Sequence, residues 1–243
     1  MVEPYVPGAP LARFIDHTLL KPSTAEKDIV LLCEEAAQHG FYSVCVNGSW
    51  VPLCRELLEG TGVRISAVVG FPLGAMATRV KAYEAAAAVE DGAAEIDMVL
   101  PVGALADGRF GVVAYDISAV VRAVEGRAIV KVILETGLLD DEHKAEACRV
   151  AEAAGAHYVK TSTGFGPGGA TEADIRLMRA SVSPGIGVKA SGGIRDAETA
   201  VRMLKCGANR LGTSAGVAIV TAGSSLSASG GSRPEGQAGS MQY

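Results

Sequence analysis

The chain has few aromatic residues and lacks any long apolar run. Aromatic side chains make up 5% of its 243 residues, and no stretch reaches the ~18 uninterrupted apolar residues of a membrane span. The first ten residues lack a basic segment followed by an apolar one, which argues against a secretion signal. We therefore expect a soluble, cytoplasmic protein that has no membrane partner.

Paired cysteines and an excess of positive charge are also missing. The five cysteines are widely spaced and form no C-x-x-C pair, so neither a disulfide framework nor a zinc knuckle is indicated. The formal net charge is -5, and no run of Lys and Arg is present. General binding to nucleic acid or to an anionic membrane is therefore not expected.

What the chain does contain is a repeated alternation of short β-branched segments with Ala- and Glu-rich helical ones. The pattern predicts strands at residues 14–19, 43–46, 65–69, 94–100, 129–134, 158–162, 187–190 and 209–212. It predicts helices at residues 24–39, 51–58, 77–90, 113–124, 140–154, 172–180 and 196–205. Such βα units, in a chain close to about 250 residues long, favour an α/β fold, a single-domain (β/α)8 TIM barrel.

The composition changes near the C-terminal end. After Val220 the chain is rich in Gly, Ser, Ala and Gln, a mixture too polar to pack into a core. We expect the barrel to occupy residues 1–221 and residues 222–243 to form a flexible, low-complexity tail.

Local signals mark several helix ends. Thr24 and Asp140 stand where a helix N-cap is expected. Glycines follow three of the predicted helices, at Gly40, Gly155 and Gly207, where a left-handed backbone often closes a helix.

Three lysines lie inside apolar strands at regular spacing. Lys131, Lys160 and Lys189 each follow a valine, and 29 residues separate each from the next, which predicts matching heights on three successive strands. Burial disfavours the ammonium form, and neighbouring cations add to that cost, so at least one of the three is expected to be a neutral, nucleophilic amine. The alternative is that these lysines reach solvent at strand ends or pair with nearby carboxylates, namely Glu95, Asp97 or Glu135.

Five polar motifs on the predicted strands point to one known family. They are Asp16-His17-Thr18, Glu95-Ile96-Asp97-Met98-Val99, Lys131-Val132-Ile133-Leu134-Glu135-Thr136, Lys160-Thr161-Ser162-Thr163-Gly164-Phe165 and Val188-Lys189-Ala190-Ser191-Gly192-Gly193-Ile194. In order and spacing they resemble the deoxyribose-phosphate aldolases, from about residue 11 to residue 220. The motif around Lys160 is long enough to be specific.

The resemblance implies a metal-independent class I aldolase, a lyase without cofactor, that reversibly cleaves 2-deoxy-D-ribose 5-phosphate to D-glyceraldehyde 3-phosphate and acetaldehyde in deoxyribose catabolism. It implies that Lys160 forms the Schiff base and that Lys189 lies beside it and depresses its pKa. Asp97 would transfer protons together with Lys189. Asp16 would orient Lys189 or substrate. A homo-oligomer is also expected.

Substrate-binding residues are expected around these groups. Lys131 would add positive charge and hydrogen bonds around the sugar hydroxyls, and Thr161 is expected to bind substrate as part of the Lys160 motif. Glycine-rich turns after the last strands offer backbone N–H groups to the phosphate. Their residues are Gly164, Gly192, Gly193, Gly212 and Ser214. The family pattern often has a second serine after the one matching Ser214, and this chain has Ala215, which puts one hydroxyl contact in doubt.

Two further residues, Cys45 and Tyr243, match positions near the active site in the family. Cys45 matches a position near the pocket in the family, but a buried cysteine is usually a small apolar residue, and no catalytic role is assigned to it. Some members of the family resemble this chain in ending with a tyrosine that helps to move the C2 proton, which makes Tyr243 a hypothesis.

Two other functions remain open at this point. Another Schiff-base barrel, a transaldolase or a keto-acid aldolase, would share the lysine and the phosphate turns, but lacks the paired lysine of the Lys189 type. A non-catalytic sugar-phosphate sensor would have no reason to keep Lys160, Lys189 and Asp97 together.

Overall fold

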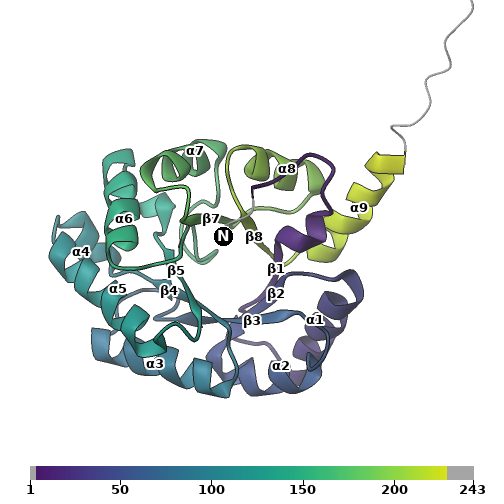
Figure 1. Ribbon diagram of the computed structural model, residues 1–243, viewed down its shortest axis with the longest axis horizontal. Coiled ribbons are helices and arrows are strands. Elements are labelled where there is room, and N and C mark those ends of the chain that lie inside the picture. Colours follow the sequence, from purple (N-terminus) through teal and green to yellow (C-terminus); the bar gives the residue numbers. More distant parts are fainter. Residues whose placement is uncertain (1–3, 229–243) are drawn as a thin grey trace, which may run out of the picture.

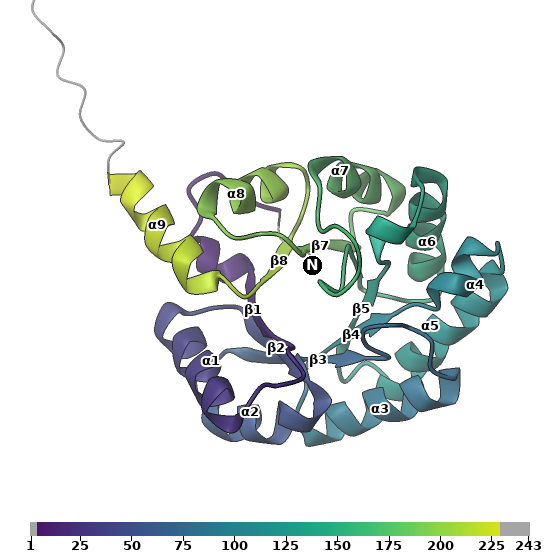
Figure 2. The same ribbon diagram turned by 180° about the vertical axis from the view of Figure 1, so that it is seen from behind.

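The computed structural model describes residues 4–228, and they form a closed barrel of parallel strands surrounded by helices. Each strand pairs with its neighbours in sequence, and β8 closes the barrel against β1. Figures 1 and 2 show the ring of strands and its helical layer from opposite sides. The predicted single-domain TIM barrel is confirmed.

The strands lie close to their predicted positions. They are β1 Ile15–Leu19, β2 Ser43–Asn47, β3 Arg64–Val69, β4 Glu95–Val99, β5 Ile129–Ile133, β6 Tyr158–Lys160, β7 Gly187–Ser191 and β8 Arg210–Thr213. Most ends agree with the sequence pattern to within one residue, and β6 ends two residues before its predicted end.

The helices of the barrel are α1 Glu26–His39, α2 Val51–Leu57, α3 Thr78–Asp91, α4 Val102–Ala106, α5 Phe110–Val124, α6 Asp141–Ala153, α7 Glu172–Ser181, α8 Ala197–Lys205 and α9 Gly216–Ala228. Short 3-10 turns lie at Leu11–Phe14, Gly48–Trp50 and Thr136–Leu138. The short helix α4 was not predicted, and α5 begins three residues before its predicted start.

A helix spans the division predicted between the barrel and the tail, and that division stays a prediction. Helix α9 was not predicted, and it continues past residue 221 to Ala228. It packs against α1 and α8. Its Gly and Ser residues each cost a helix up to about 1 kcal/mol relative to Ala, which weakens a helix without ending it. The rest of the predicted tail, residues 229–243, lies outside the described residues.

One predicted helix cap was wrong. The N-cap of α1 is Ala25, and the hydroxyl of Thr24 instead donates to the carbonyl of Lys21 over 2.7 Å. The N-cap at Asp140 is confirmed, since its carboxylate accepts from the backbone N–H of His143 over 2.8 Å. The three glycines predicted to close helices, Gly40, Gly155 and Gly207, all have positive φ.

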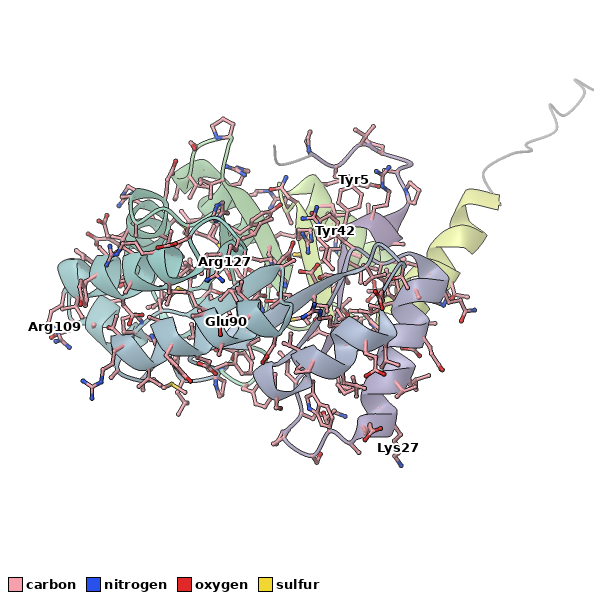
Figure 3. The ribbon with its side chains drawn as sticks, turned by 60° about the horizontal axis from the view of Figure 1, so that its bottom comes forward. Tyr5, Lys27, Tyr42, Glu90, Arg109 and Arg127 are labelled. Carbon is pink, nitrogen blue, oxygen red and sulfur yellow. The ribbon has the colours of Figure 1, made fainter. Side chains whose placement is uncertain are left out.

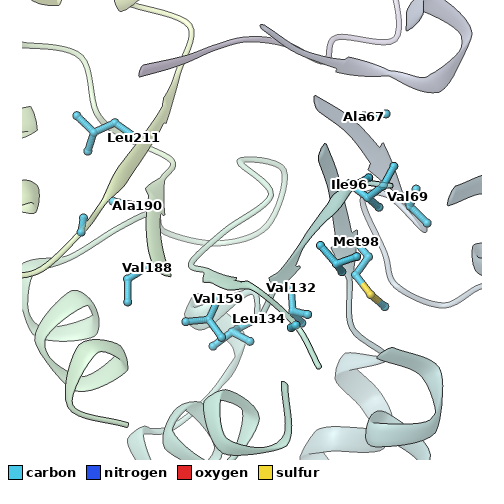
Figure 4. Packing of buried hydrophobic residues seen from close by; sticks show 14 of the residues in the cluster. Ala67, Val69, Ile96, Met98, Val132, Leu134, Val159, Val188, Ala190 and Leu211 are labelled. Atoms are coloured by element: carbon cyan, nitrogen blue, oxygen red, sulfur yellow. The ribbon is translucent and has the colours of Figure 1, made fainter. Parts of the chain in front are cut away.

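Alternate side chains of each strand face opposite sides of the barrel wall. One set is apolar and packs under the helices, as Figure 4 shows for Ile96, Met98, Val132, Val188 and Ala190. The other set faces the barrel interior and is unusually polar, because Asp97, Lys131 and Lys189 stand between those apolar neighbours. The core therefore lies outside the strands, while the interior is left for charged groups.

A buried ion pair between two helices of the outer layer lies at the ends of two strands. The amino group of Lys81 on α3 donates to Asp116 Oδ2 of α5 over 2.7 Å and to the carbonyl of Val99 over 2.9 Å. Glu84, one turn along α3, accepts from the backbone N–H of Gly70 over 2.8 Å. These contacts fix the C-terminal ends of β3 and β4, and β4 carries Asp97.

The outer surface is charged over most of the helical layer. In Figure 3, Lys27 and Arg109 point away from the barrel. An exposed apolar patch interrupts this surface where α3 and α5 pack side by side, and its residues are Val80, Tyr83, Val112 and Tyr115. Tyr83 is 77% exposed and Tyr115 is 63% exposed.

Candidate active site

Two of the strand lysines meet on one carboxylate oxygen inside the barrel. Lys160 ends β6 and Lys189 is its register partner on β7. Both amino groups donate to Oδ2 of Asp97 on β4, each over 2.8 Å. All three side chains are buried. The predicted grouping of these three residues is therefore present in the fold.

The third lysine lies lower in the barrel than predicted. Lys131 pairs in register with Tyr158, whereas Lys160 pairs with Ile133, two residues further along β5. Equal spacing in sequence did not give equal height, because the stagger between β5 and β6 differs from that between β6 and β7. The prediction of matching height holds for Lys160 and Lys189 and is wrong for Lys131.

The amino group of Lys131 is fully engaged at this lower level. It contacts Asp97 Oδ1 over 2.6 Å, Glu95 Oε2 over 2.6 Å and the hydroxyl of Ser66 over 3.1 Å. An ammonium has three N–H donors. A contact with a sugar hydroxyl would require one of these bonds to break, so the structure places Lys131 as an electrostatic support beneath the site. The pairing with carboxylates considered for the strand lysines is thus present for Lys131.

Asp16 lies between Lys189 and Arg210 inside the barrel. Its Oδ2 is 2.5 Å from the amino group of Lys189. Its Oδ1 accepts from the hydroxyl of Ser43 over 2.7 Å and from Nε of Arg210 over 2.9 Å. The carboxylate is therefore held in one orientation with one oxygen toward the lysine, and its role in orienting Lys189 or substrate stays a prediction.

These contacts decide the charge of most groups in the cluster. Burial alone raises the pKa of Asp97, but Lys131, Lys160 and Lys189 outweigh it and hold that pKa well below its ordinary value. Burial likewise raises the pKa of Asp16, and Arg210 and Lys189 together lower it further than burial raises it. Both carboxylates are therefore anionic at neutral pH.

The two supporting lysines are held charged. Burial by itself lowers the pKa of Lys189, but Asp16 and Asp97 raise it above its ordinary value. Lys131 behaves alike, with burial opposed by Asp97 and Glu95, and its pKa is also raised. A neutral amine is thus not expected at Lys131 or Lys189, because carboxylates stand between the lysines and compensate their charges. Lys160 is left as the candidate nucleophile.

An apolar wall faces this cluster. Leu20, Cys45 and Val68 form a small buried group with Phe71 packed against it. The thiol of Cys45 lies 3.9 Å from Asp97 Oδ2. Burial raises the pKa of this thiol, which keeps it uncharged. The wall supplies a water-poor surface next to the lysines, and the structure gives Cys45 a contact in the site that the sequence reading did not assign to it.

Thr161 connects the two lysine-bearing strands. Its hydroxyl donates to the carbonyl of Ser191 over 2.9 Å and accepts from the N–H of Ser191 over 3.0 Å. Both bonds join the end of β6 to the end of β7, directly beyond Lys160 and Lys189. The structure therefore places Thr161 as a link between strands, and its contact with substrate stays a prediction.

The predicted phosphate turns gather at the same end of the barrel. Gly164, Gly192 and Gly193 all have positive φ, a conformation that L side chains rarely adopt. The loop after β6 touches the turn after β7, where the N–H of Ala170 donates to the carbonyl of Gly192 over 3.0 Å. A Cβ on Gly212 would lie 3.0 Å from the Lys189 side chain, so this glycine permits close approach of β8.

Ser214 is the first residue after β8. It is exposed and lines a cavity of about 370 Å³ together with His17, Lys21 and Glu35. The N–H of the following Ala215 donates to the hydroxyl of Thr213 over 2.9 Å. A second cavity, of about 1200 Å³, lies on the outer face of the barrel between the N-terminal segment, α8 and α9, and contains none of the strand lysines.

Glu135 is a buried residue that the sequence reading considered only as a lysine partner. Its carboxylate instead binds the hydroxyl of Thr163 and accepts from the N–H of Thr163, 3.3 Å from Oε1. The same hydroxyl accepts from the N–H of Phe165 over 3.0 Å. Glu135 also has a positive φ of 58°, which is a strained conformation for this residue type. It shapes the loop that carries Gly164.

One residue of the interior was missed. Arg210 opens β8 and is buried against Asp16 and Glu95, and its guanidinium lies 3.5 Å from the centroid of the Tyr42 ring. The available signal was an arginine inside a predicted strand, of the same kind as the lysines.

Tyr243 lies outside the described residues. Within residues 4–228 there is no group of three or more His, Cys, Asp or Glu side chains that could hold a metal ion.

Comparison with known proteins agrees with this geometry. A family model described as DeoC/LacD family aldolase matches residues 11–222. The chain belongs to this aldolase family. It is 57% identical over 210 residues to deoxyribose-phosphate aldolase 1 of Bacillus licheniformis, covering 86% of this chain and 94% of that one. The identity to the deoxyribose-phosphate aldolase of Bacillus subtilis is 56% over 210 residues, with the same coverage.

A solved structure in the family has the same barrel. The chain resembles the deoxyribose phosphate aldolase of Aeropyrum pernix, described as having a unique tetrameric structure, with a TM-score of 0.83 and 37% identity over 89% of this chain and 92% of that one. None of the helices described for this aldolase is long and apolar enough to cross a membrane.

Proposed function

We infer that this aldolase cleaves 2-deoxy-D-ribose 5-phosphate reversibly to D-glyceraldehyde 3-phosphate and acetaldehyde through a Schiff base on Lys160. The observation that carries this function is the shared carboxylate oxygen, because Asp97 Oδ2 binds the amino groups of both Lys160 and Lys189. Its relatives at 56–57% identity are named deoxyribose-phosphate aldolases.

The reaction begins with attack of the Lys160 amine on the substrate aldehyde carbon, C1. The carbinolamine loses water, and the resulting iminium is an electron sink two bonds from the bond to be broken. Lys189 is kept protonated by its two carboxylate partners, so it can donate a proton to the departing hydroxyl group. Asp97 lies within hydrogen-bond reach of both amines and can pass protons between them.

Cleavage requires removal of the proton from the C3 hydroxyl. The C2–C3 bond then breaks, its electron pair moves toward the iminium, and glyceraldehyde 3-phosphate leaves. An enamine of acetaldehyde remains on Lys160. Protonation at C2 regenerates an iminium, and water releases acetaldehyde and the free amine.

The substrate phosphate is proposed to bind at the glycine turns. Gly164, Gly192 and Gly193 present backbone N–H groups at the C-terminal end of the barrel, the end at which TIM-barrel enzymes bind their substrates. Ser214 extends this site onto the β8–α9 turn, and Gly212 lies just before that turn, inside β8. Supporting this placement, the turn after β7 and the loop after β6 are joined by a backbone hydrogen bond between Ala170 and Gly192.

We also propose that this aldolase acts in the cytoplasm, without nucleic acid, as a homo-oligomer. The exposed patch of Val80, Tyr83, Val112 and Tyr115 is a candidate contact between copies. Sedimentation of the protein and of a Tyr83→Ser, Tyr115→Ser variant tests this. A monomer at all concentrations would contradict the assembly, and an unchanged oligomer in the variant would contradict this patch.

The covalent mechanism is tested by sodium borohydride reduction in the presence of 2-deoxyribose 5-phosphate or acetaldehyde, followed by peptide mass spectrometry. The expected result is a stable adduct on Lys160, and none in a Lys160→Met variant. An adduct confined to Lys131 or Lys189, or no adduct at all, would show that Lys160 is not the nucleophile.

A further inference from the structure

The charged side chains inside the barrel form a closed ring of alternating sign, called here the charge ring. Its members, in order of contact, are Asp97, Lys189, Asp16, Arg210, Glu95 and Lys131, which returns to Asp97. Every neighbouring pair is joined by an ion pair, and all six residues are at most 2% exposed. The ring spans five strands, so each charge is held from two sides.

The lower half of the ring is built around an arginine. Arg210 donates from Nε to Asp16 Oδ1 over 2.9 Å and from its terminal nitrogens to the two oxygens of Glu95 over 3.0 and 3.2 Å. Tyr42 lies against the guanidinium at 3.5 Å, and Figure 3 shows where this tyrosine lies in the fold. Arginine does not lose its proton in proteins, so this positive charge is permanent.

The ring is electrically neutral by count. Arg210, Lys131 and Lys189 contribute three positive charges, and the three carboxylates contribute three negative ones. Lys160 is attached from outside the ring, through Asp97 alone among the described carboxylates. The loss of one charge from the ring would therefore leave the opposite charge uncompensated in a buried interior next to Lys160, which is costly.

The other titratable groups at this level do not alter the count. Cys45 on β2 and Tyr158 on β6 are both buried, and burial raises the pKa of each, so both are uncharged at neutral pH. The hydroxyls of Ser43 on β2 and Ser66 on β3 bind the ring carboxylates and carry no charge.

We propose that Arg210 and Glu95 are positioning residues that set the charge balance of the ring beside Lys160 and thereby the pH range in which the site is active. Neither residue reaches the substrate end of the barrel. They act through Asp16 and Lys131, which in turn hold Lys189 and Asp97. This inference rests on the proposed role of Lys160 as the Schiff-base residue.

The proposal predicts opposite effects for the two residues. Arg210→Met leaves the ring with one excess negative charge, which favours protonation of the site and moves the acid limb of kcat/KM to higher pH. Glu95→Gln leaves one excess positive charge and moves that limb to lower pH. Across several ångströms of protein, a unit charge corresponds to a shift of about one pH unit in each direction.

The experiment is the pH profile of kcat/KM for 2-deoxyribose 5-phosphate in the wild type, Arg210→Met, Glu95→Gln and the double variant Arg210→Met with Glu95→Met. The double variant removes one charge of each sign, so its acid limb is expected to return to the wild-type position. Arg210→Lys keeps the positive charge, so its acid limb is also expected to stay at the wild-type position. Arg109→Met removes an exposed charge on the outer surface and serves as the matched control.

Circular dichroism identifies any variant that does not fold, and Glu95→Gln is nearly isosteric, so it carries the test if Arg210→Met fails. The proposal is supported if the acid limb lies at the lowest pH for Glu95→Gln and at the highest pH for Arg210→Met. The wild type and the double variant should lie together between them. Coincident profiles, or shifts of the same sign in both single variants, overturn it. Absence of a borohydride adduct on wild-type Lys160 would instead overturn the proposed function.

Discussion

Lys160 and Lys189 occupy partner positions on neighbouring strands, and their amino groups share a single oxygen of Asp97. The two amines are nevertheless not equivalent. Lys189 has a second carboxylate, Asp16, at 2.5 Å, whereas Lys160 has none among the described residues. The difference in partners supports the proposed division of roles, with Lys189 as the acid and Lys160 as the nucleophile.

The first prediction concerns this division of roles. Lys189→Met is expected to lower kcat by about 10²–10⁴-fold, because the proton donor for carbinolamine dehydration is lost. Asp97→Asn is expected to lower kcat comparably, since both amines lose their shared anion. Steady-state kinetics measures both. A Lys189→Met variant that retains wild-type kcat would show that another group supplies the proton.

The second prediction concerns Glu135 and the loop after β6. Glu135→Gln weakens the bond to the Thr163 hydroxyl and so loosens the loop that carries Gly164. If that loop binds phosphate, kcat/KM for 2-deoxyribose 5-phosphate is expected to fall by about tenfold, the equivalent of one hydrogen bond, while kcat/KM for unphosphorylated 2-deoxyribose changes little.

The exposed carboxylate Glu142 on α6 provides the matched control, as Glu142→Gln. Kinetics with both sugars separates loop positioning from general damage to the fold. Equal losses on the two substrates would show that Glu135 supports the barrel as a whole and has no particular link to the phosphate.

The third prediction concerns the ion pair between α3 and α5. Lys81→Met leaves Asp116 buried without its cation and is expected to lower the free energy of unfolding by about 3–5 kcal/mol. The double variant Lys81→Met, Asp116→Leu removes both charges and is expected to be markedly more stable than the single variant. Urea denaturation measures both. If the double variant were the less stable of the two, the pair would be contributing more than it costs to bury.

The fourth prediction is the pH range of stability. Asp16 and Asp97 have lowered pKa values, so their stabilising contribution is present above the ordinary carboxyl value of 3.8 and is lost as the pH falls below it. Lys131 and Lys189 have raised pKa values, so theirs is complete below the ordinary value of 10.5 and is lost as the pH rises above it.

The charge ring is therefore expected to give a broad stability plateau that weakens below pH 3.8 and above pH 10.5. Urea midpoints measured between pH 3 and 11 test this. A decline that begins near pH 8 would show that the two ring lysines are not held in their charged form.

Much of the fold was readable from sequence because the barrel repeats a local pattern. The strands were located from their β-branched residues, and helix ends at Asp140 and Gly40 from local backbone preferences. Errors arose where local signals were weak or ambiguous. Thr24 bonds back to Lys21 and leaves the cap to Ala25, and α9 continues through Gly and Ser residues that read as a tail.

The residues of the site were found because a charged side chain inside an apolar strand is visible in sequence. Lys160 and Lys189 were singled out on that ground. The motifs around them identified the family, and the family resemblance pointed to Asp97. Arg210 carries the same signal, but no motif drew attention to it, and its partners Asp16 and Glu95 lie 194 and 115 residues away.

The sequence by itself determined the barrel, the family and the buried lysines of the site, since these depend on periodicity and on residue types at local spacing. The tertiary structure decided which charges meet. The stagger between strands placed Lys131 below Lys160, and closure of β8 on β1 brought Arg210 to Asp16. Ion pairing depends on distances of a few ångströms, and those are set by strand register and barrel closure, which join residues far apart in the chain.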